Sequence, residues 1–237
     1  MEKGPVVIFC ISGQKRAGKD TIANYIREHV IASRVSFADP VRDVCRAYFR
    51  WDDDWLLGEH KEDTDPYWGI SPRQAMQYLG TEVGRVGIAE NYPEFKSVTG
   101  DKIWIKNAQQ KIRNLTDEKY VEKYGNGLIG EFKAFVVPDL RFLNEYDAMK
   151  NMESEGYKVV TIGVRRNGLP SDSHASETEI KDCVEKCDFI LENNRKISDL
   201  EEKVNEIITW SEVELKPNWM REDKQLEMNL DDQSKAS

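Results

Sequence analysis

Residues 5–21 read Pro-Val-Val-Ile-Phe-Cys-Ile-Ser-Gly-Gln-Lys-Arg-Ala-Gly-Lys-Asp-Thr, and this stretch decides the fold. Residues 5–12 form a continuous apolar run of strand length. Because the run is apolar on both faces, it is typical of a central strand in a parallel sheet. A helical pattern follows over about residues 20–30. Residues 13–21 lie between the two and match the spacing G-x-x-x-x-G-K of a phosphate-binding loop.

This loop has the chemistry that an anion site needs. Its glycines let the backbone wrap tightly, so that several N–H groups converge on one anion, and the helix N-terminus adds partial positive charge. Lys19 is expected to reach the β- and γ-phosphates of a nucleotide. The alternative is a glycine turn that binds no ligand. The residues that we expect at the nucleotide are Gly13, Lys15, Arg16, Ala17, Gly18, Lys19, Asp20 and Thr21.

The loop departs from the usual pattern at one position. Asp20 follows the loop lysine, where a Ser or Thr ordinarily binds Mg²⁺. Thr21 comes one residue later and is expected to hydrogen-bond a phosphate. Asp20 is expected to hold Mg²⁺ directly or through water.

Further strands and helices alternate along the rest of the chain. Such alternation predicts βαβ units and a parallel sheet covered on both faces. The expected strands are 34–38, 132–137, 157–164 and 189–191, and the expected helices are 41–49, 71–83, 101–115, 142–152 and 197–210. We predict one α/β domain over residues 1–215, with a helical insertion at about 41–131, a lid at about 165–178 and a flexible polar tail over 216–237. The acidic segment 51–66 is interpreted as a loop or insertion.

Composition excludes several classes of protein. The 237 residues carry 34 basic and 43 acidic side chains, a net charge of −9, which disfavours general binding of nucleic acid or anionic membranes. No apolar run approaches about 18 residues, and the N-terminus lacks a signal-peptide cleavage site, so we expect no membrane span and a cytosolic location. The four cysteines are expected to be reduced thiols. Cys183 and Cys187 share a helical face, but no second pair lies at zinc-finger spacing.

A second group of candidates follows the strand at 132–137. Asp139 stands at the carboxyl end of that strand, where a second Mg²⁺ anchor is expected beside the phosphate loop. Arg141 is positioned to clamp a phosphate with two hydrogen bonds. The alternatives are a helix cap for Asp139 and a surface salt bridge for Arg141.

Phosphoryl transfer also needs a second anion site and a basic lid. Arg73 and Gln77 are four residues apart on one helix face, and with Arg85 they are candidates for holding a second nucleotide. Arg42 follows the helix start at Asp39-Pro40. Arg165 and Arg166 end a strand and open a loop with Gly168 and Pro170, which suits a lid. The alternative for each of these groups is a set of solvated surface charges.

Six segments of the chain, taken in order, resemble the deoxynucleoside monophosphate kinases of tailed bacteriophages. These segments are Gly13–Thr21, Phe37–Pro40, Arg73–Glu82, Val137–Arg141, His174–Glu177 and Asp188–Asn193. The resemblance spans about residues 6–210, and the Lys-Asp-Thr ending of the loop is shared with this family.

The resemblance implies a P-loop NTPase fold of the nucleoside monophosphate kinase type, in which helices flank a central parallel sheet and helical segments bind the acceptor and form the lid. It implies ATP and Mg²⁺ as cofactors, a deoxynucleoside 5′-monophosphate as acceptor, a diphosphate product that feeds DNA synthesis, and a homodimer. A phage-encoded protein would work in the host cytoplasm.

The resemblance also implies a role for each site residue. Lys19 and Thr21 are placed on the ATP phosphates, and Asn193 is placed near the adenine. The acceptor side is assigned to Asp39, Arg42, Arg73, Gln77 and Arg85. Asp139 and Arg141 serve the reacting phosphates, and Arg165 belongs to the lid.

Two other readings stay open. Animal-type phosphomevalonate kinase has a similar Lys-Asp loop and Asp-x-Arg strand end, and dephospho-coenzyme A kinase is a more distant possibility; the helix ending Leu79–Glu82 favours a nucleotide acceptor instead. Alternatively, the chain is a nucleotide-binding regulator without turnover. Lys19→Ala separates these readings, because only an enzyme loses turnover.

Overall fold

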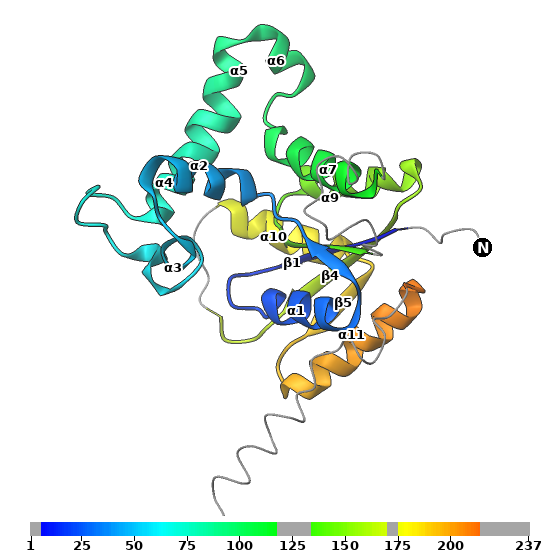
Figure 1. Cartoon of the computed structure of the whole chain (residues 1–237). Coiled ribbons are helices and arrows are strands. Elements are labelled where there is room, and N and C mark those ends of the chain that lie inside the picture. Colours follow the sequence, from blue (N-terminus) through cyan, green and yellow to red (C-terminus); the bar gives the residue numbers. More distant parts are fainter. Residues whose placement is uncertain (1–5, 118–133, 170–174, 214–237) are drawn as a thin grey trace, which may run out of the picture.

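The computed structural model describes residues 6–117, 134–169 and 175–213, and the side chains of 175–178 are outside that description. Figure 1 shows the whole chain. The predicted tail at 216–237 lies outside the described residues. So do His174, residues 118–131 of the predicted insertion and residues 170–174 of the predicted lid.

A parallel sheet forms the centre of the described structure. Its strand order is β2-β3-β1-β4-β5, and every neighbouring pair runs parallel. The strands are β1 (Val7–Gly13), β2 (Ala32–Arg34), β3 (Ala134–Leu140), β4 (Lys158–Arg165) and β5 (Phe189–Glu192). Every residue of β1 is buried, as expected for a strand covered on both faces.

Helices cover both faces of the sheet, as the alternating pattern predicts. The α-helices are α1 (Lys19–His29), α2 (Asp39–Phe49), α3 (Asp53–Leu56), α4 (Pro72–Tyr78), α5 (Ile88–Asn91), α6 (Pro93–Val98), α7 (Ile103–Thr116), α9 (Leu143–Lys150), α10 (Ala175–Lys186) and α11 (Ile197–Ser211). The described residues also form two 3-10 turns, η1 (Glu59–Glu62) and η3 (Asn151–Glu155), and a π-helix, η2 (Leu79–Gly87).

The two faces of β1 point into two separate cores. Phe9 and Ile11 pack with the apolar sides of α1 and α11. Ile8 and Cys10 face the opposite side and pack with α7 and α9. The alternation of side chains along a strand produces this division. The predicted apolar stripe of α11 is confirmed: Leu200, Val204, Ile207 and Ile208 are all buried.

The second strand differs from the prediction. It was expected over 34–38, but β2 ends at Arg34. The amide of Val35 still donates to the carbonyl of Val136 (3.0 Å), and the chain then leaves the sheet. The reason is that residues 36–38 are bound by a side chain of β3, as described below.

The third strand ends later than predicted, and its predicted first residues, 132 and 133, lie outside the described residues. It was expected to close before Pro138, yet β3 includes that proline and ends at Leu140. Proline has no N–H to give to a ladder, and the register between β1 and β3 shifts between Cys10 and Ser12. The strand therefore carries Asp139 within its last residues.

The segment between β2 and β3 contains the helices α2 to α7, the 3-10 turn η1 and the π-helix η2. Figure 1 shows α5 and α6 far from the sheet, beyond α2 and α4. The expected loop at 51–66 contains α3 and η1, because Asp52 caps the first turn by accepting from the amide of Trp55 (3.2 Å). The helix expected to end near Val83 continues as the π-helix η2.

The π-helix is built around a tryptophan. Trp104 of α7 donates its indole N–H to the carbonyl of Gly80 (2.8 Å). A Cβ atom at Gly84 would lie 2.2 Å from the Trp104 ring, so this position needs glycine. A π-helix has i→i+5 hydrogen bonds, so its backbone spiral is wider than that of an α-helix.

All four cysteines are free and buried. Burial raises the pKa of Cys45 to about 11 and the pKa of both Cys183 and Cys187 to about 12, and it raises the pKa of Cys10 further. The thiols are therefore protonated at neutral pH. No helix in the described part of the chain has the length and apolar character to cross a membrane.

Candidate nucleotide-binding site

The loop after β1 wraps as a phosphate-binding loop does. Its amino end is closed by a hydrogen bond from the amide of Ala17 to the carbonyl of Gln14 (3.1 Å). Gly18 has φ of 110°, a left-handed conformation that favours glycine, and α1 begins at the next residue. The Lys19 ammonium folds over the loop and donates to the carbonyls of Gly13 (2.7 Å) and Gln14 (2.8 Å).

Asn193 supports this loop from the end of β5. Its side-chain amide donates to the carbonyl of Ala17 (2.8 Å), and its backbone amide donates to the carbonyl of Arg165 (2.7 Å). A Cβ atom at Gly18 would lie 2.3 Å from that side-chain nitrogen, which is a second reason for glycine there. The structure thus gives Asn193 a role in holding the loop, and its expected proximity to an adenine stays a prediction.

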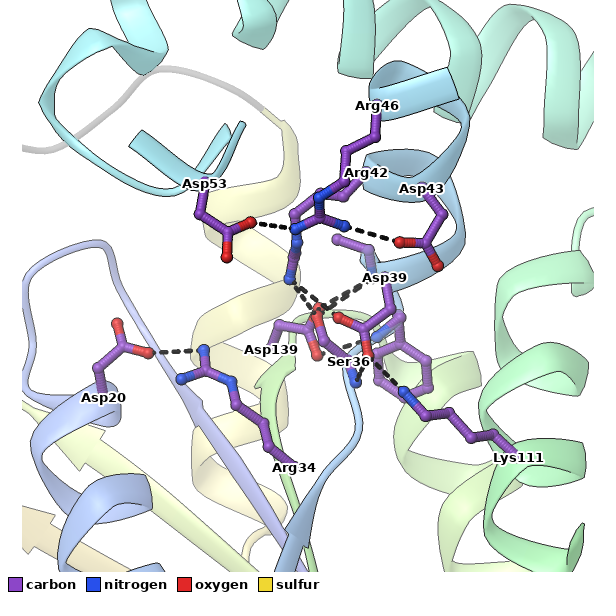
Figure 2. Close-up of polar contacts among 12 residues, drawn as sticks. Asp20, Arg34, Ser36, Asp39, Arg42, Asp43, Arg46, Asp53, Lys111 and Asp139 are labelled. Carbon is purple, nitrogen blue, oxygen red and sulfur yellow. Dashed lines mark hydrogen bonds and ion pairs between the residues drawn. The ribbon is translucent and has the colours of Figure 1, made fainter. Parts of the chain in front are cut away.

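Asp20 and Thr21 lie exposed on the first turn of α1. The Asp20 carboxylate forms an ion pair with Arg34 at the end of β2 (2.9 Å). Figure 2 shows this pair beside, but separate from, the polar cluster around Ser36. Sequence reasoning missed Arg34, because nothing in its local pattern distinguishes it from a surface arginine.

Asp139 binds the loop that follows β2. Its carboxylate accepts from the Ser36 hydroxyl (2.5 Å) and from the amides of Phe37 (3.2 Å) and Ala38 (3.2 Å). The helix-cap alternative for Asp139 is wrong. Glu145 takes that position, since its carboxylate accepts from the amide of Phe142 (3.1 Å) at the start of α9.

Asp39 and Arg42 continue the cluster from the first turns of α2 (Figure 2). The Arg42 guanidinium is buried; it donates to the Ser36 hydroxyl (3.0 Å) and forms an ion pair with Asp39 (3.3 Å). Lys111 of α7 pairs with the other side of Asp39 (3.1 Å). The carboxylates of Asp39 and Asp139 therefore fix the position of Arg42 through direct contacts and through Ser36.

Glu145 joins Arg85 to the strand end at Arg141. Its buried carboxylate accepts from the amide of Arg141 (2.9 Å) and lies 3.5 Å from the Arg85 guanidinium. Arg85 also stands over the Phe142 ring, 5.0 Å from its centroid. Burial raises the pKa of Glu145 to about 7 despite these favourable contacts.

An exposed glutamate connects the phosphate loop to α4. Glu62 of η1 lies 2.6 Å from Arg73 Nε and 3.2 Å from Lys15 Nζ. Arg73, expected on the acceptor side, is thus held next to the donor loop. Gln77 is exposed on the same helix, and its side chain forms no hydrogen bond with another described residue.

Arg165 and Arg166 lie at the carboxyl end of β4, next to the phosphate loop. Arg166 donates to the carbonyl of Arg16 (3.5 Å), while Arg165 forms ion pairs with Glu185 and Glu192. A cavity of about 320 Å³ opens here. Its lining includes Gln14, Arg165, Arg166, Asn167, Lys181 and Glu185. The structure therefore brings the predicted lid arginines next to the loop after β1.

Two observations decide the fold. The parallel sheet has the strand order 2-3-1-4-5, and the loop after its central strand, β1, leads directly into α1. The fold is that of a P-loop α/β protein. The predicted central parallel sheet flanked by helices is confirmed.

Known proteins that are similar to this chain include two that are named as kinases. No family model matches the chain. The chain is 29% identical over 201 residues to a protein of Acanthamoeba polyphaga mimivirus named "Putative deoxynucleotide monophosphate kinase", covering 82% of this chain and 92% of that protein. The expected resemblance to deoxynucleoside monophosphate kinases is therefore confirmed. A dephospho-CoA kinase from Campylobacter jejuni aligns with a TM-score of 0.42 and 16% identity, covering 86% of this chain and 95% of that one.

The candidate site contains carboxylates but no preassembled metal centre among the described residues, where no three His, Cys, Asp or Glu side chains gather to hold an ion. Asp20 is exposed and presents oxygen, the donor that Mg²⁺ prefers, although its Oδ1 atom is paired with Arg34 (2.9 Å). The oxygens of Asp139 already accept three hydrogen bonds. Asp20 therefore fits a magnesium ligand better than Asp139 does.

The structure adds residues that sequence reasoning missed. They are Arg34, Ser36, Lys61, Glu62, Lys111 and Glu145. Glu145 carried a local signal, because it lies at the third position of a helix, where a glutamate caps the N-terminus. Lys61 and Glu62 carried none, since the acidic segment around them shows no periodicity.

Proposed function

We propose that the chain is an ATP-dependent kinase that converts deoxynucleoside 5′-monophosphates to diphosphates. The observation that carries the proposal is a phosphate loop linked through Glu62 to a second group of cations, which supplies one anion site for each substrate. The second group comprises Arg42, Arg73, Arg85 and Arg141. The named viral relative supports a nucleotide as the acceptor.

The loop would hold the donor. Lys19 leaves its contacts with the Gly13 and Gln14 carbonyls to bind the β- and γ-phosphates of ATP. Thr21 adds a hydroxyl contact. Asp20 would hold Mg²⁺, which neutralises phosphate charge when bound. Arg165 and Arg166 would close over the γ-phosphate and exclude water, which would otherwise take the phosphoryl group.

The second group of cations would hold the acceptor. An oxygen of its monophosphate attacks the γ-phosphorus in line, a new P–O bond forms, and the bond to the β,γ-bridging oxygen breaks to release ADP. The attacking oxygen is already ionised, so this transfer needs positioning and charge neutralisation more than a general base. Asp39 and Ser36 position Arg42 for this task, and Glu145 positions Arg85.

A coupled ADP-release assay with ATP and Mg²⁺ tests the proposal. The acceptors are dGMP, dTMP, dCMP, dAMP, the four ribonucleotides, phosphomevalonate and dephospho-coenzyme A. We expect turnover with one or more deoxynucleotides. Turnover confined to phosphomevalonate or dephospho-coenzyme A would replace the proposed acceptor, and silence on all of them with ATP still bound would favour a regulator.

Lys19→Ala provides the control for chemistry at the loop. We expect turnover to fall by about 10²-fold or more, because a charge that stabilises the transition state is lost. Thermal melting should show that the variant is folded. Undiminished phosphoryl transfer by Lys19→Ala would contradict the role given to the loop.

A further inference from the structure

The 3-10 turn η1 brings the acidic segment 51–66 into the site. Glu62 ends this turn and contacts both Arg73 of α4 (2.6 Å) and Lys15 of the phosphate loop (3.2 Å). The turn is therefore fixed from two sides, between the donor loop and the helix expected to bind the acceptor. The residue before Glu62 is Lys61, which is half-buried.

The charged groups that act on Lys61 are mostly positive. Its ammonium interacts with the guanidinium groups of Arg73, Arg42 and Arg141, and burial together with these three charges lowers its pKa. Glu62 opposes this effect only weakly. Arg42 is buried, Lys61 and Arg73 are half-buried and Arg141 is exposed. Gathering four like charges at one site, three of them at least partly withdrawn from water, costs free energy, which a protein tolerates chiefly where function requires it.

The charges of this cluster are only partly neutralised. Arg42 has Asp39 as an ion-pair partner, and Arg73 has Glu62. Within the described residues, neither Lys61 nor the guanidinium of Arg141 forms a hydrogen bond or ion pair. Among the residues that the structure describes, two of the four cations therefore have no anionic partner.

We propose that Lys61 binds the phosphate of the acceptor, completing a site with Arg42, Arg73 and Arg141. The inference rests on the proposed function in taking this anion to be a nucleoside monophosphate. A phosphate dianion accepts several charge-assisted hydrogen bonds at once, so it can engage Lys61 and a guanidinium fork together. The acidic segment would then be part of the acceptor site.

A structural lysine would behave in the opposite way. Such a residue is paired or solvated, and its removal lowers stability. Removing the charge of Lys61 should instead relieve repulsion among Arg42, Arg73 and Arg141, so the ligand-free protein should become more stable while acceptor binding weakens. The change in stability therefore has opposite signs for the two roles: removing a binding lysine raises stability, and removing a structural lysine lowers it.

Lys61→Met, Lys61→Arg and Lys203→Met test the inference. Lys203→Met is the matched control, because Lys203 is an exposed lysine on α11, which packs on the opposite side of the sheet from α7 and α9.

For Lys61→Met we expect the acceptor KM to rise about 10- to 100-fold, which corresponds to the loss of one hydrogen bond between charged groups. The KM for ATP should stay within about twofold, and the ligand-free melting temperature should rise. Lys61→Arg should restore most of the acceptor affinity, and Lys203→Met should resemble the wild type.

Three outcomes would decide the matter. An unchanged acceptor KM in Lys61→Met, with the wild type active, would overturn the inference and leave the proposed function standing. A lower melting temperature with unchanged KM values would show a structural role and overturn it as well. If the wild type phosphorylates no nucleotide, stabilisation by inorganic phosphate becomes the readout: loss of that stabilisation in Lys61→Met alone supports the anion site, and its persistence overturns it.

Discussion

Glu145 illustrates how one residue couples folding to the site. Its carboxyl is buried, accepts from the amide of Arg141, and lies 3.5 Å from the Arg85 guanidinium. Because burial disfavours the ionised form more than these contacts favour it, the pKa rises to about 7 from an unfolded value near 4.5. The residue therefore binds a proton more tightly in the folded protein.

The raised pKa of Glu145 predicts a pH-dependent contribution to stability. Between about pH 4.5 and pH 7 the folded state binds more protons than the unfolded state, so this contribution falls as the pH rises and levels off above about pH 7. Relative to Glu145→Gln, the wild type should gain about 2 kcal/mol in free energy of unfolding on going from pH 8 to pH 5. Urea unfolding at the two pH values measures this. Parallel pH profiles for the two proteins would contradict it.

At the scale of residues, the sequence indicated the positions that a local pattern marks. The loop motif marks Gly18 and Lys19, and the strand end marks Asp139 and Arg141. The structure places the first two where the loop after β1 meets α1 and Asp139 within the end of β3, while the functional roles stay predictions. Lys111 is different, because it reaches Asp39 from a helix 72 positions away in the sequence. Only the tertiary fold creates that contact, so no pattern around Lys111 could have indicated it.

At the scale of elements, the π-helix η2 depends on glycines with different requirements. A Cβ atom at Gly84 would collide with the Trp104 ring at 2.2 Å, whereas one at Gly80 would meet Val41 at an ordinary 3.6 Å. The contact at Gly84 brings η2 close to α7. The widened helix and the tryptophan therefore form one unit.

The two glycines make a matched pair of substitutions. Gly84→Ala should lower the free energy of unfolding by about 1–3 kcal/mol, because the ring or the helix must move. Gly80→Ala should be neutral or stabilise by up to about 1 kcal/mol, since alanine loses less conformational entropy within a helix. Urea titrations of both variants measure the difference, and an equal loss in the two would show that the Trp104 contact is unimportant.

Hydrophobic patterns located the elements better than they located the ends of the elements. The buried stripe of α11 and the apolar run of β1 were sufficient to place both. Patterns failed where a distant group sets the boundary, as at β2, whose end depends on Asp139 binding residues 36–38. They also failed over α3 and η1, where short turns are held by single side-chain contacts.

At the scale of the whole molecule, charge is distributed unevenly. The chain carries a net charge of −9, yet Arg42, Arg73, Arg141 and Lys61 converge at one site. Surrounding negative charge repels anions that approach elsewhere and leaves this region as the favourable destination.

This distribution predicts a salt effect on the acceptor. Raising NaCl from about 0.1 M to about 1 M shortens the screening length from about 10 Å to about 3 Å. The acceptor KM should rise severalfold, and the buried position of Arg42 should keep the effect below that of fully exposed charges. Initial-rate kinetics at matched viscosity measure it; a KM independent of salt would mean that these cations do not bind the acceptor.

The buried cysteines offer a practical advantage. All four thiols are shielded and protonated at neutral pH, so maleimide dyes should leave the native chain largely unmodified. A pair of new cysteines, one on an exposed position of α6 and one on α11, could then be labelled without removing any natural thiol. Energy transfer between the two dyes would report the distance between the outlying helices and the sheet in single molecules during turnover.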